Sequence, residues 1–325
     1  MLHFKKAELC IKFCNRFLRS DSNKGLIKLK CLDKHEGLIS GLPKHLNAPS
    51  KFRNLVKPFG FFLLVTGTSV TACGIWQYEN IRKLTKADFN SALNMKIPKF
   101  GSVRKKISDH WINNLNEGQK LIALIIGMNV AVFIMWKISK FQPFLMNFFA
   151  SHPNSKHSCL SMLLSSFSQY NTWHLTFNMI ALWSFGTPAL QILGKEQFLA
   201  FYLMAGTFSS LISYVLKIAL QSNAFSMGAS GAIMALVSCV CIQYPNAQLS
   251  LIILPWINFS ALTALKGLLI FDSLGILMRW KLFDHAAHLG GMLFGIWYWK
   301  YGDEYIWSKR EKIISYWHEF RKSRN

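Results

Sequence analysis

A succession of apolar runs, each close to the length of a membrane-spanning helix, constrains the fold of this 325-residue chain more than any other feature. A bilayer core is about 30 Å thick, and a helix needs about 20 mostly apolar residues to cross it. The runs lie at about 58–78, 121–138, 173–193, 197–219, 230–244, 259–279 and 285–301. With 51% hydrophobic and 16% charged residues, the chain is predicted to be an all-α membrane protein.

The spacing of these runs predicts a 1+6 arrangement, in which one extra spanning helix precedes a core of six. The extra helix is expected at 58–78, a solvent-exposed basic loop at 79–119 and the six-helix core at 120–303. Within the loop we expect a short helix at about 107–115. Pro255 interrupts the apolar stretch that leads into 259–279, so an extended or broken segment is expected there.

Both ends of the chain are expected to lie outside the membrane core. Residues 1–57 hold 13 Lys or Arg against 4 Asp or Glu, and they contain no apolar run long enough to span. Their opening stretch mixes basic and apolar residues at roughly helical spacing, with Glu8 as its single acid, which is typical of a mitochondrial presequence. A disordered basic tail is the alternative. Residues 304–325 are polar with aromatic residues, so we predict an interfacial tail.

The net charge of +22 does not indicate a nucleic-acid partner. The basic residues lie mainly outside the apolar runs, as is usual for the flanks of membrane helices, and no base-stacking or groove-reading motif is visible. The seven cysteines show no disulfide framework. A zinc site built from His174, His285 and His288 is not expected, because these residues match no ligand motif such as HExxH. We therefore expect neither a metal nor a cofactor.

The tetrapeptide Gly228-Ala229-Ser230-Gly231 opens an apolar helix that is too short to cross a bilayer. At ~1.5 Å per residue, the roughly 14 residues before Tyr244 span about 21 Å. The start of this helix should therefore lie below the membrane surface, where irregular backbone is tolerated only beside a cavity. We expect a submerged polar pocket with Ser230 at its floor. The alternative is that Ser230 only caps the helix.

A second helix opens with a histidine, in the stretch Ala287-His288-Leu289-Gly290-Gly291. Small residues recur on one face of each helix, at Gly231 and Ala235 on the first and at Ala287, Gly291 and Gly295 on the second. Such residues let two backbones approach closely. Close approach is what a hydrogen bond between a nucleophilic serine and its base requires. The alternative is that His288 is a packed histidine at a helix start.

His174 and Asn178 lie four residues apart, so they share one face of an otherwise apolar helix. Polar groups on such a helix are expected to point inward. They are candidate donors for an oxyanion that develops at Ser230, beside the backbone N–H of Ser230 itself. The alternative is an interhelical hydrogen bond without a role in catalysis.

Three motifs on successive membrane helices resemble those of the rhomboid intramembrane serine proteases. They are HxxxN at His174 and Asn178, GxSG from Gly228, and AHxGG from Ala287. The resemblance covers about residues 120–302, and the stretches SMGASGAIM and FDHAAHLGGMLFGIWY resemble the mitochondrial members of animals most. The extra first span also matches the mitochondrial subfamily.

The resemblance implies a role for each matching residue. Ser230 matches the nucleophile, His288 the general base, His174 and Asn178 the oxyanion-hole residues, and Gly228 the first glycine of the serine motif. The family uses a Ser–His dyad without a carboxylate. Where bacterial members carry a tyrosine that packs on the histidine, this chain has Met234, which we expect to support the ring through a sulfur–aromatic contact.

The resemblance therefore implies a serine endopeptidase of the mitochondrial inner membrane that cleaves single-span membrane proteins within the bilayer, with roles in quality control and apoptosis. One alternative is a catalytically inactive rhomboid-like binder or escort, against which the presence of both Ser230 and His288 argues. Another is a transporter or channel, which the intramembrane Asp272 would fit. We expect Asp272 to pair with Lys266 or Arg279, or to face a polar cavity. The oligomeric state is not predicted.

Overall fold

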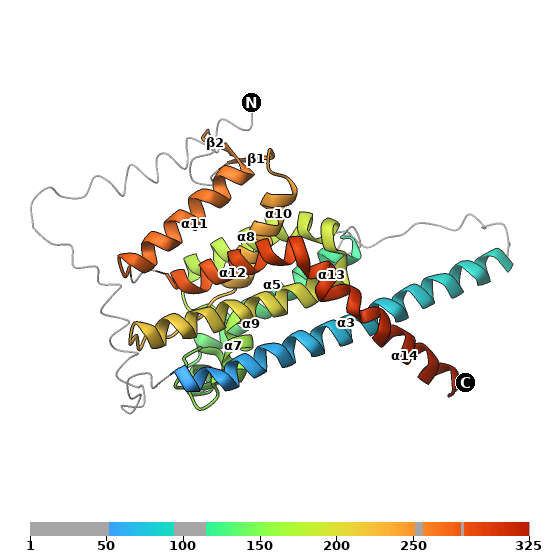
Figure 1. Ribbon diagram of the computed structural model, residues 1–325, viewed down its shortest axis with the longest axis horizontal. Helices are drawn as coiled ribbons and strands as arrows, with labels where there is room; N and C mark the ends of the chain where they lie inside the picture. Colours follow the sequence, from blue (N-terminus) through green and yellow to red (C-terminus); the bar gives the residue numbers. More distant parts are fainter. Residues whose placement is uncertain (1–51, 94–114, 251–255, 281–282, 325) are drawn as a thin grey trace, which may run out of the picture. The chain divides into compact units, whose positions relative to one another are not determined.

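The computed structural model describes residues 52–93, 115–250, 256–280 and 283–324 (Figure 1). The longer helices are α3 (Val56–Leu93), α5 (Glu117–Trp136), α8 (Thr172–Leu193), α9 (Lys195–Ala219), α10 (Ser230–Gln243), α11 (Ala261–Leu277), α12 (His285–Trp297) and α14 (Arg310–Lys322). Shorter helical segments are η1 (Phe52–Leu55), η3 (Ser139–Phe141), α6 (Gln142–Phe149), α7 (Ser158–Leu164), η4 (Ser165–Phe167), η5 (Tyr298–Gly302), α13 (Asp303–Tyr305) and η6 (Trp307–Lys309). Most of the predicted leader, and nearly all of the predicted short helix at 107–115, lie outside the described residues.

The predicted core helices form close to their expected positions, and local signals mark their ends. Asn116 caps α5 in a capping box, accepting from the Gln119 amide (2.7 Å) while the Gln119 side chain accepts from the Asn116 amide (3.0 Å). Asn171 caps α8 by accepting a hydrogen bond from the Trp173 amide (2.8 Å). Gly194, at φ +75°, separates α8 from α9, a conformation that favours glycine.

Helix α3 is longer than the predicted span at 58–78, because it continues to Leu93 through part of the predicted loop. Its second half contains neither glycine nor proline, and α14 packs against it. Glu79 Oε1 accepts hydrogen bonds from Trp317 Nε1 (3.0 Å) and Arg321 Nη1 (2.8 Å). Residues 79–93, predicted as part of the loop, are therefore helical. Part of the predicted C-terminal tail forms α14, which packs against α3.

Helix α9 lies between α3 and α12 and contacts both (Figure 1). Its side chains are among the most buried of the protein, including Phe198, Phe201, Tyr202 and Met204, none of which is exposed. Phe201 packs edge-on against Tyr298, with ring centroids 4.9 Å apart. These contacts place the hydrophobic core around α9.

Among the described residues, three stretches are long and apolar enough to cross a membrane: Val56–Thr85, Glu117–Trp136 and Lys195–Ala219. The shorter α10 packs against α8, α9 and α12. The backbones of α10 and α12 approach so closely that a Cβ added at Gly291 would overlap the Gly231 carbonyl oxygen. A Cβ at Gly295 would overlap the Ala235 carbonyl oxygen in the same way.

The broken segment that Pro255 predicts has extended backbone at both of its ends. Strand β1 (Gln248–Ser250) pairs antiparallel with β2 (Asn258–Ser260), with Leu249 opposite Phe259. Ser260 then caps α11 by accepting a hydrogen bond from the Thr263 amide (3.2 Å). The chain thus leaves α10 and enters α11 through a two-stranded hairpin, which sets where α11 begins.

Candidate active site

Ser230 is the first residue of α10, and its hydroxyl faces a histidine instead of capping the helix. The N-cap position belongs to Ala229, which makes no side-chain hydrogen bond there. Ser230 Oγ lies 2.8 Å from His288 Nε2, within hydrogen-bond distance. The first amides of α10, including that of Ser230, have no partner within the helix, so they are available to an anion at this point.

The turn before Ser230 requires glycine at its sharpest point. Gly228 has φ +147°, and a Cβ there would lie 2.8 Å from His174 Cε1. The Gly228 amide donates to the Ser165 carbonyl (3.0 Å), which fixes the turn against η4. The imidazole of His174 therefore lies beside the turn that presents Ser230.

His288 lies in the first turn of α12 and is only 7% exposed. Asp284 caps this helix by accepting a hydrogen bond from the Ala287 amide (3.0 Å). The cap and the close packing of α10 on α12 fix the two helix starts that carry Ser230 and His288. The predicted pair thus comes together through helix geometry, from residues far apart in the sequence.

Asp272 of α11 contacts the other side of His288. Its Oδ1 atom lies 3.3 Å from His288 Nδ1 and 2.6 Å from His285 Nδ1, and the residue is 1% exposed. The expectation that Asp272 pairs with Lys266 or Arg279 is wrong, because the side-chain partners of its carboxylate among the described residues are the two histidines. Lys266 lies two turns earlier on α11, and Arg279 follows its end at φ +53°, so neither reaches the carboxylate.

Asn178 takes part in a buried chain of amides. Its Nδ2 donates to Gln169 Oε1 (3.1 Å), and Gln169 Nε2 donates to Asn129 Oδ1 (3.3 Å). Asn129 in turn donates to the Ile125 carbonyl (2.9 Å). This network was not predicted. The sequence signal that could have indicated it is Asn129, a polar residue in the apolar run at 121–138. The role of Asn178 as an oxyanion donor stays a prediction.

The aromatic neighbour of His288 that the structure shows is Phe283, with ring centroids 6.0 Å apart. Met234 is half-buried at the edge of the core cluster around α9 and α10. Its predicted sulfur–aromatic contact with His288 stays a prediction. Support for the ring comes in the structure from Asp272 and Phe283, neither of which belongs to the HxxxN, GxSG and AHxGG motifs.

A second buried polar cluster links the loop before Ser230 to the start of α12. Lys217 Nζ lies 3.6 Å from Asp284 Oδ2, and Ser213 Oγ donates to the same oxygen (2.6 Å). Ser226 Oγ also donates to Asp284, and the Ser226 backbone pairs with that of Ser151. Burial alone would raise the pKa of Asp284, but Lys217 and these hydrogen bonds lower it to about 2. The cluster therefore keeps the Asp284 side chain ionised at the N-cap of α12.

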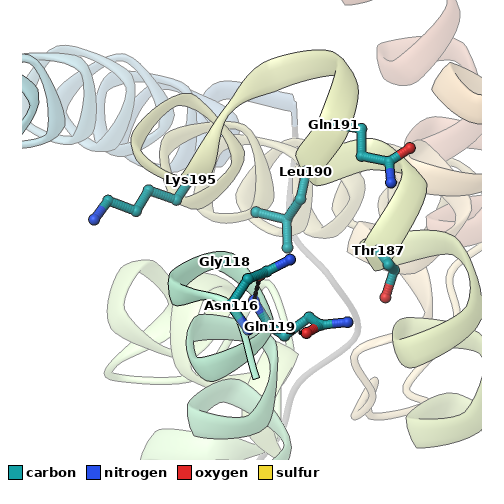
Figure 2. A pocket seen from close by; sticks show the side chains of 7 residues that line it. All are labelled: Asn116, Gly118, Gln119, Thr187, Leu190, Gln191 and Lys195. Carbon is teal, nitrogen blue, oxygen red and sulfur yellow. Dashed lines mark hydrogen bonds between the residues drawn. The ribbon is translucent and has the colours of Figure 1, made fainter. Parts of the chain in front are cut away.

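No group of three or more His, Cys, Asp or Glu side chains suited to a metal ion occurs within the described part of the chain. A shallow hollow lies elsewhere, between the start of α5 and the α8–α9 junction, as Figure 2 shows. It is lined by Asn116, Gly118, Gln119, Thr187, Leu190, Gln191 and Lys195. None of these residues belongs to the site around Ser230.

The structure brings a serine and a histidine together at the starts of two apolar helices, and comparison with known proteins gives the family of the chain. A Rhomboid domain is matched over residues 156–302. The chain belongs to the rhomboid family.

Its similarity extends well beyond that domain. It is 42% identical over 295 residues to the Presenilin-associated rhomboid-like protein, mitochondrial, of Mus musculus, covering 89% of this chain and 78% of that protein. Presenilin-associated rhomboid-like protein A, mitochondrial, of Danio rerio is 38% identical over 326 residues, covering 93% and 85%. Rhomboid protein 1, mitochondrial, of Saccharomyces cerevisiae is 33% identical over 203 residues, covering 60% and 57%. With the apolar helices, these relatives confirm the prediction of a multi-pass mitochondrial membrane protein.

Proposed function

We propose that the chain is an intramembrane serine endopeptidase with Ser230 as nucleophile and His288 as general base. The observation that carries the proposal is the 2.8 Å distance between Ser230 Oγ and His288 Nε2 at the starts of two apolar helices. A serine and a base at this separation are able to exchange a proton. Membership of the rhomboid family supports a mitochondrial rhomboid-type protease.

In the proposed reaction, Ser230 Oγ attacks the carbonyl carbon of a peptide bond while its proton passes to His288 Nε2. The oxyanion is stabilised by the Ser230 N–H and by side-chain donors from His174 and Asn178. His288 then gives the proton to the leaving amine, and water hydrolyses the acyl-enzyme. Asn178 Nδ2 carries two hydrogens, so it is able to donate one to the oxyanion while the other stays hydrogen-bonded to Gln169 Oε1.

We propose the 1+6 arrangement for the membrane domain, with α3 as the extra helix and α5, α8, α9, α10, α11 and α12 as the core. The packing of α3 along α9, outside the helices that carry Ser230 and His288, supports this arrangement. Residues 1–57 are proposed to include a mitochondrial presequence. The inner membrane is the proposed location.

The proposed substrates are proteins with one membrane span, in roles that include quality control and apoptosis signalling. A helical substrate hides its peptide bonds, so it must unwind near the cut. We expect a preference for small or helix-breaking residues there. An inactive escort of membrane proteins is the second candidate, and the hydrogen-bonded Ser230–His288 pair favours the protease.

The test is cleavage of a tagged single-span mitochondrial protein in reconstituted vesicles. Wild type is compared with Ser230→Ala, His288→Ala and the matched control Ser238→Ala, which removes a buried hydroxyl from the same helix. We expect wild type and Ser238→Ala to release the shortened product and the other two variants to release none. Equal behaviour of all four folded proteins would assign the chain to the escort function.

A further inference from the structure

We infer that Asp272 is a positioning residue for His288, and that His285 in turn holds Asp272. The inference rests on the proposed protease function. It adds a carboxylate from α11 to a site that the family resemblance describes as a dyad of α10 and α12. The carboxylate touches neither the substrate bond nor Ser230, so its effect passes through the imidazole.

The two ring nitrogens of His288 face different partners. Nε2 faces Ser230 Oγ at 2.8 Å, and Nδ1 faces Asp272 Oδ1 at 3.3 Å. An ionised carboxylate only accepts hydrogen bonds, so Nδ1 carries the proton in this pairing. The lone pair of Nε2 is then directed at the serine, which is the tautomer that a general base requires.

His285 anchors the carboxylate more tightly than His288 does. Its Nδ1 lies 2.6 Å from the same oxygen, and the side chain is 3% exposed. The ring of His285 is enclosed by Phe271, Trp280 and Phe283, with centroids 5.5, 5.8 and 6.0 Å away. Because these rings restrict its motion, His285 fixes Asp272 at a constant position beneath His288.

The backbone of α11 is shaped to accept this contact. Gly275, three residues after Asp272, leaves the space that the His285 ring fills, and a Cβ there would lie 2.5 Å from His285 Cγ. Gly275 itself is buried. The close approach of α11 to the first turn of α12 therefore depends on the same residues that bring the carboxylate to the histidines.

Among the titratable and charged side chains near Asp272, the imidazoles of His285 and His288 contact its carboxylate. From α12, His285 and His288 face it, and His174 of α8 lies on the opposite, Ser230, side of the site. On α11 itself, Lys266 and Arg279 make no ion pair with it in the described structure. Asp272 Oδ1 thus lies where it accepts a hydrogen bond from the imidazolium that forms when His288 takes the proton of Ser230.

The primary variant is Asp272→Asn, which keeps the size of the side chain but offers an amide in place of the carboxylate. In a Ser-His-Asp triad this change lowers kcat by about 10⁴. Because the contact here is longer and shared, we expect a loss of roughly 10- to 100-fold in kcat with KM nearly unchanged.

The experiment is performed on the full chain in vesicles, with wild type and Ser230→Ala in parallel and thermal unfolding as a check on folding. Inactive wild type would refute the proposed function itself. Active wild type together with an Asp272→Asn variant of unchanged kcat would overturn only the role of Asp272.

If Asp272→Asn does not fold, a second pair of variants decides. His285→Asn keeps a donor near the Nδ1 position, whereas His285→Leu removes it. We expect His285→Leu to lower kcat and His285→Asn to retain most of it. Equal rates in both variants, at the wild-type level, would overturn the inference.

Discussion

The substitution Gly291→Ala tests whether the spacing of α10 and α12 sets activity. A Cβ at this position would lie 2.0 Å from the Gly231 carbonyl oxygen, whereas real Cβ contacts are essentially never shorter than 3.0 Å. The backbones must therefore separate by at least about 1 Å (3.0 minus 2.0) to remove the overlap. Because Ser230 is adjacent to Gly231, most of this shift reaches the pair of reacting side chains.

The expected loss follows from the geometry. A shift of about 1 Å along the Ser230–His288 direction would lengthen the present 2.8 Å contact to about 3.8 Å, beyond hydrogen-bond range. A misplacement of about 1 Å is able to cost about 100-fold in rate, so we expect roughly a 100-fold loss in kcat. Overpacking of this kind also lowers the free energy of unfolding by about 1–3 kcal/mol.

The assay combines cleavage of a single-span substrate in vesicles with thermal unfolding of the same preparations. The matched control is Gly127→Ala on α5, where nothing lies within 4 Å of the added Cβ. The control should keep wild-type activity and stability, because alanine favours a helix over glycine. A Gly291→Ala protein with wild-type kcat and an unchanged unfolding temperature would refute the idea that backbone contact positions the dyad.

Three further predictions concern the surroundings of the dyad. Burial, and to a smaller extent Lys217, lower the pKa of His152 from 6.5 to about 4. The contribution of neutral His152 to the free energy of unfolding should therefore be fully present above pH 6.5 and be lost as the pH falls toward 4. His152→Phe should flatten this part of a plot of unfolding temperature against pH. Lys217→Met should destabilise the fold by about 3 kcal/mol, the lower end of the range for breaking a buried pair, since the Asp284 carboxylate loses its counter-ion but keeps its hydrogen bonds. Chemical denaturation should show recovery in the double variant with Asp284→Asn. Gly228→Ala should abolish cleavage while the protein still inserts, because the residue has φ +147° and its Cβ would meet His174; normal product release from this variant would contradict the account of the turn.

The helices could be predicted from sequence because their signals are local. Apolar run lengths marked α8, α9 and α10 to within a few residues, and Pro255 marked the break before α11. The end of α3 could not be predicted in this way. Polar residues after Tyr78 suggest a loop, but contacts with α14 from the far end of the chain hold them in a helix.

The residues of the candidate site were likewise predictable only where their signals are local. Ser230 and His288 were identifiable because serine and histidine are costly in apolar helices unless they face a cavity or a partner, and the structure brings the two together. The partner of Asp272 was not identifiable, because it depends on the rotation of α11 against α12. The Gln169–Asn178 contact depends likewise on how a connecting segment folds back on α8.

The distribution of the site over three helices has a consequence for biogenesis. Ser230 is on α10, Asp272 on α11 and His288 on α12, so the ribosome delivers the serine well before its base. A chain interrupted during synthesis or insertion carries a nucleophile that nothing activates. If the site acts as proposed, proteolytic capacity arises only when the last core helix has docked, which protects neighbouring membrane proteins from every incomplete copy.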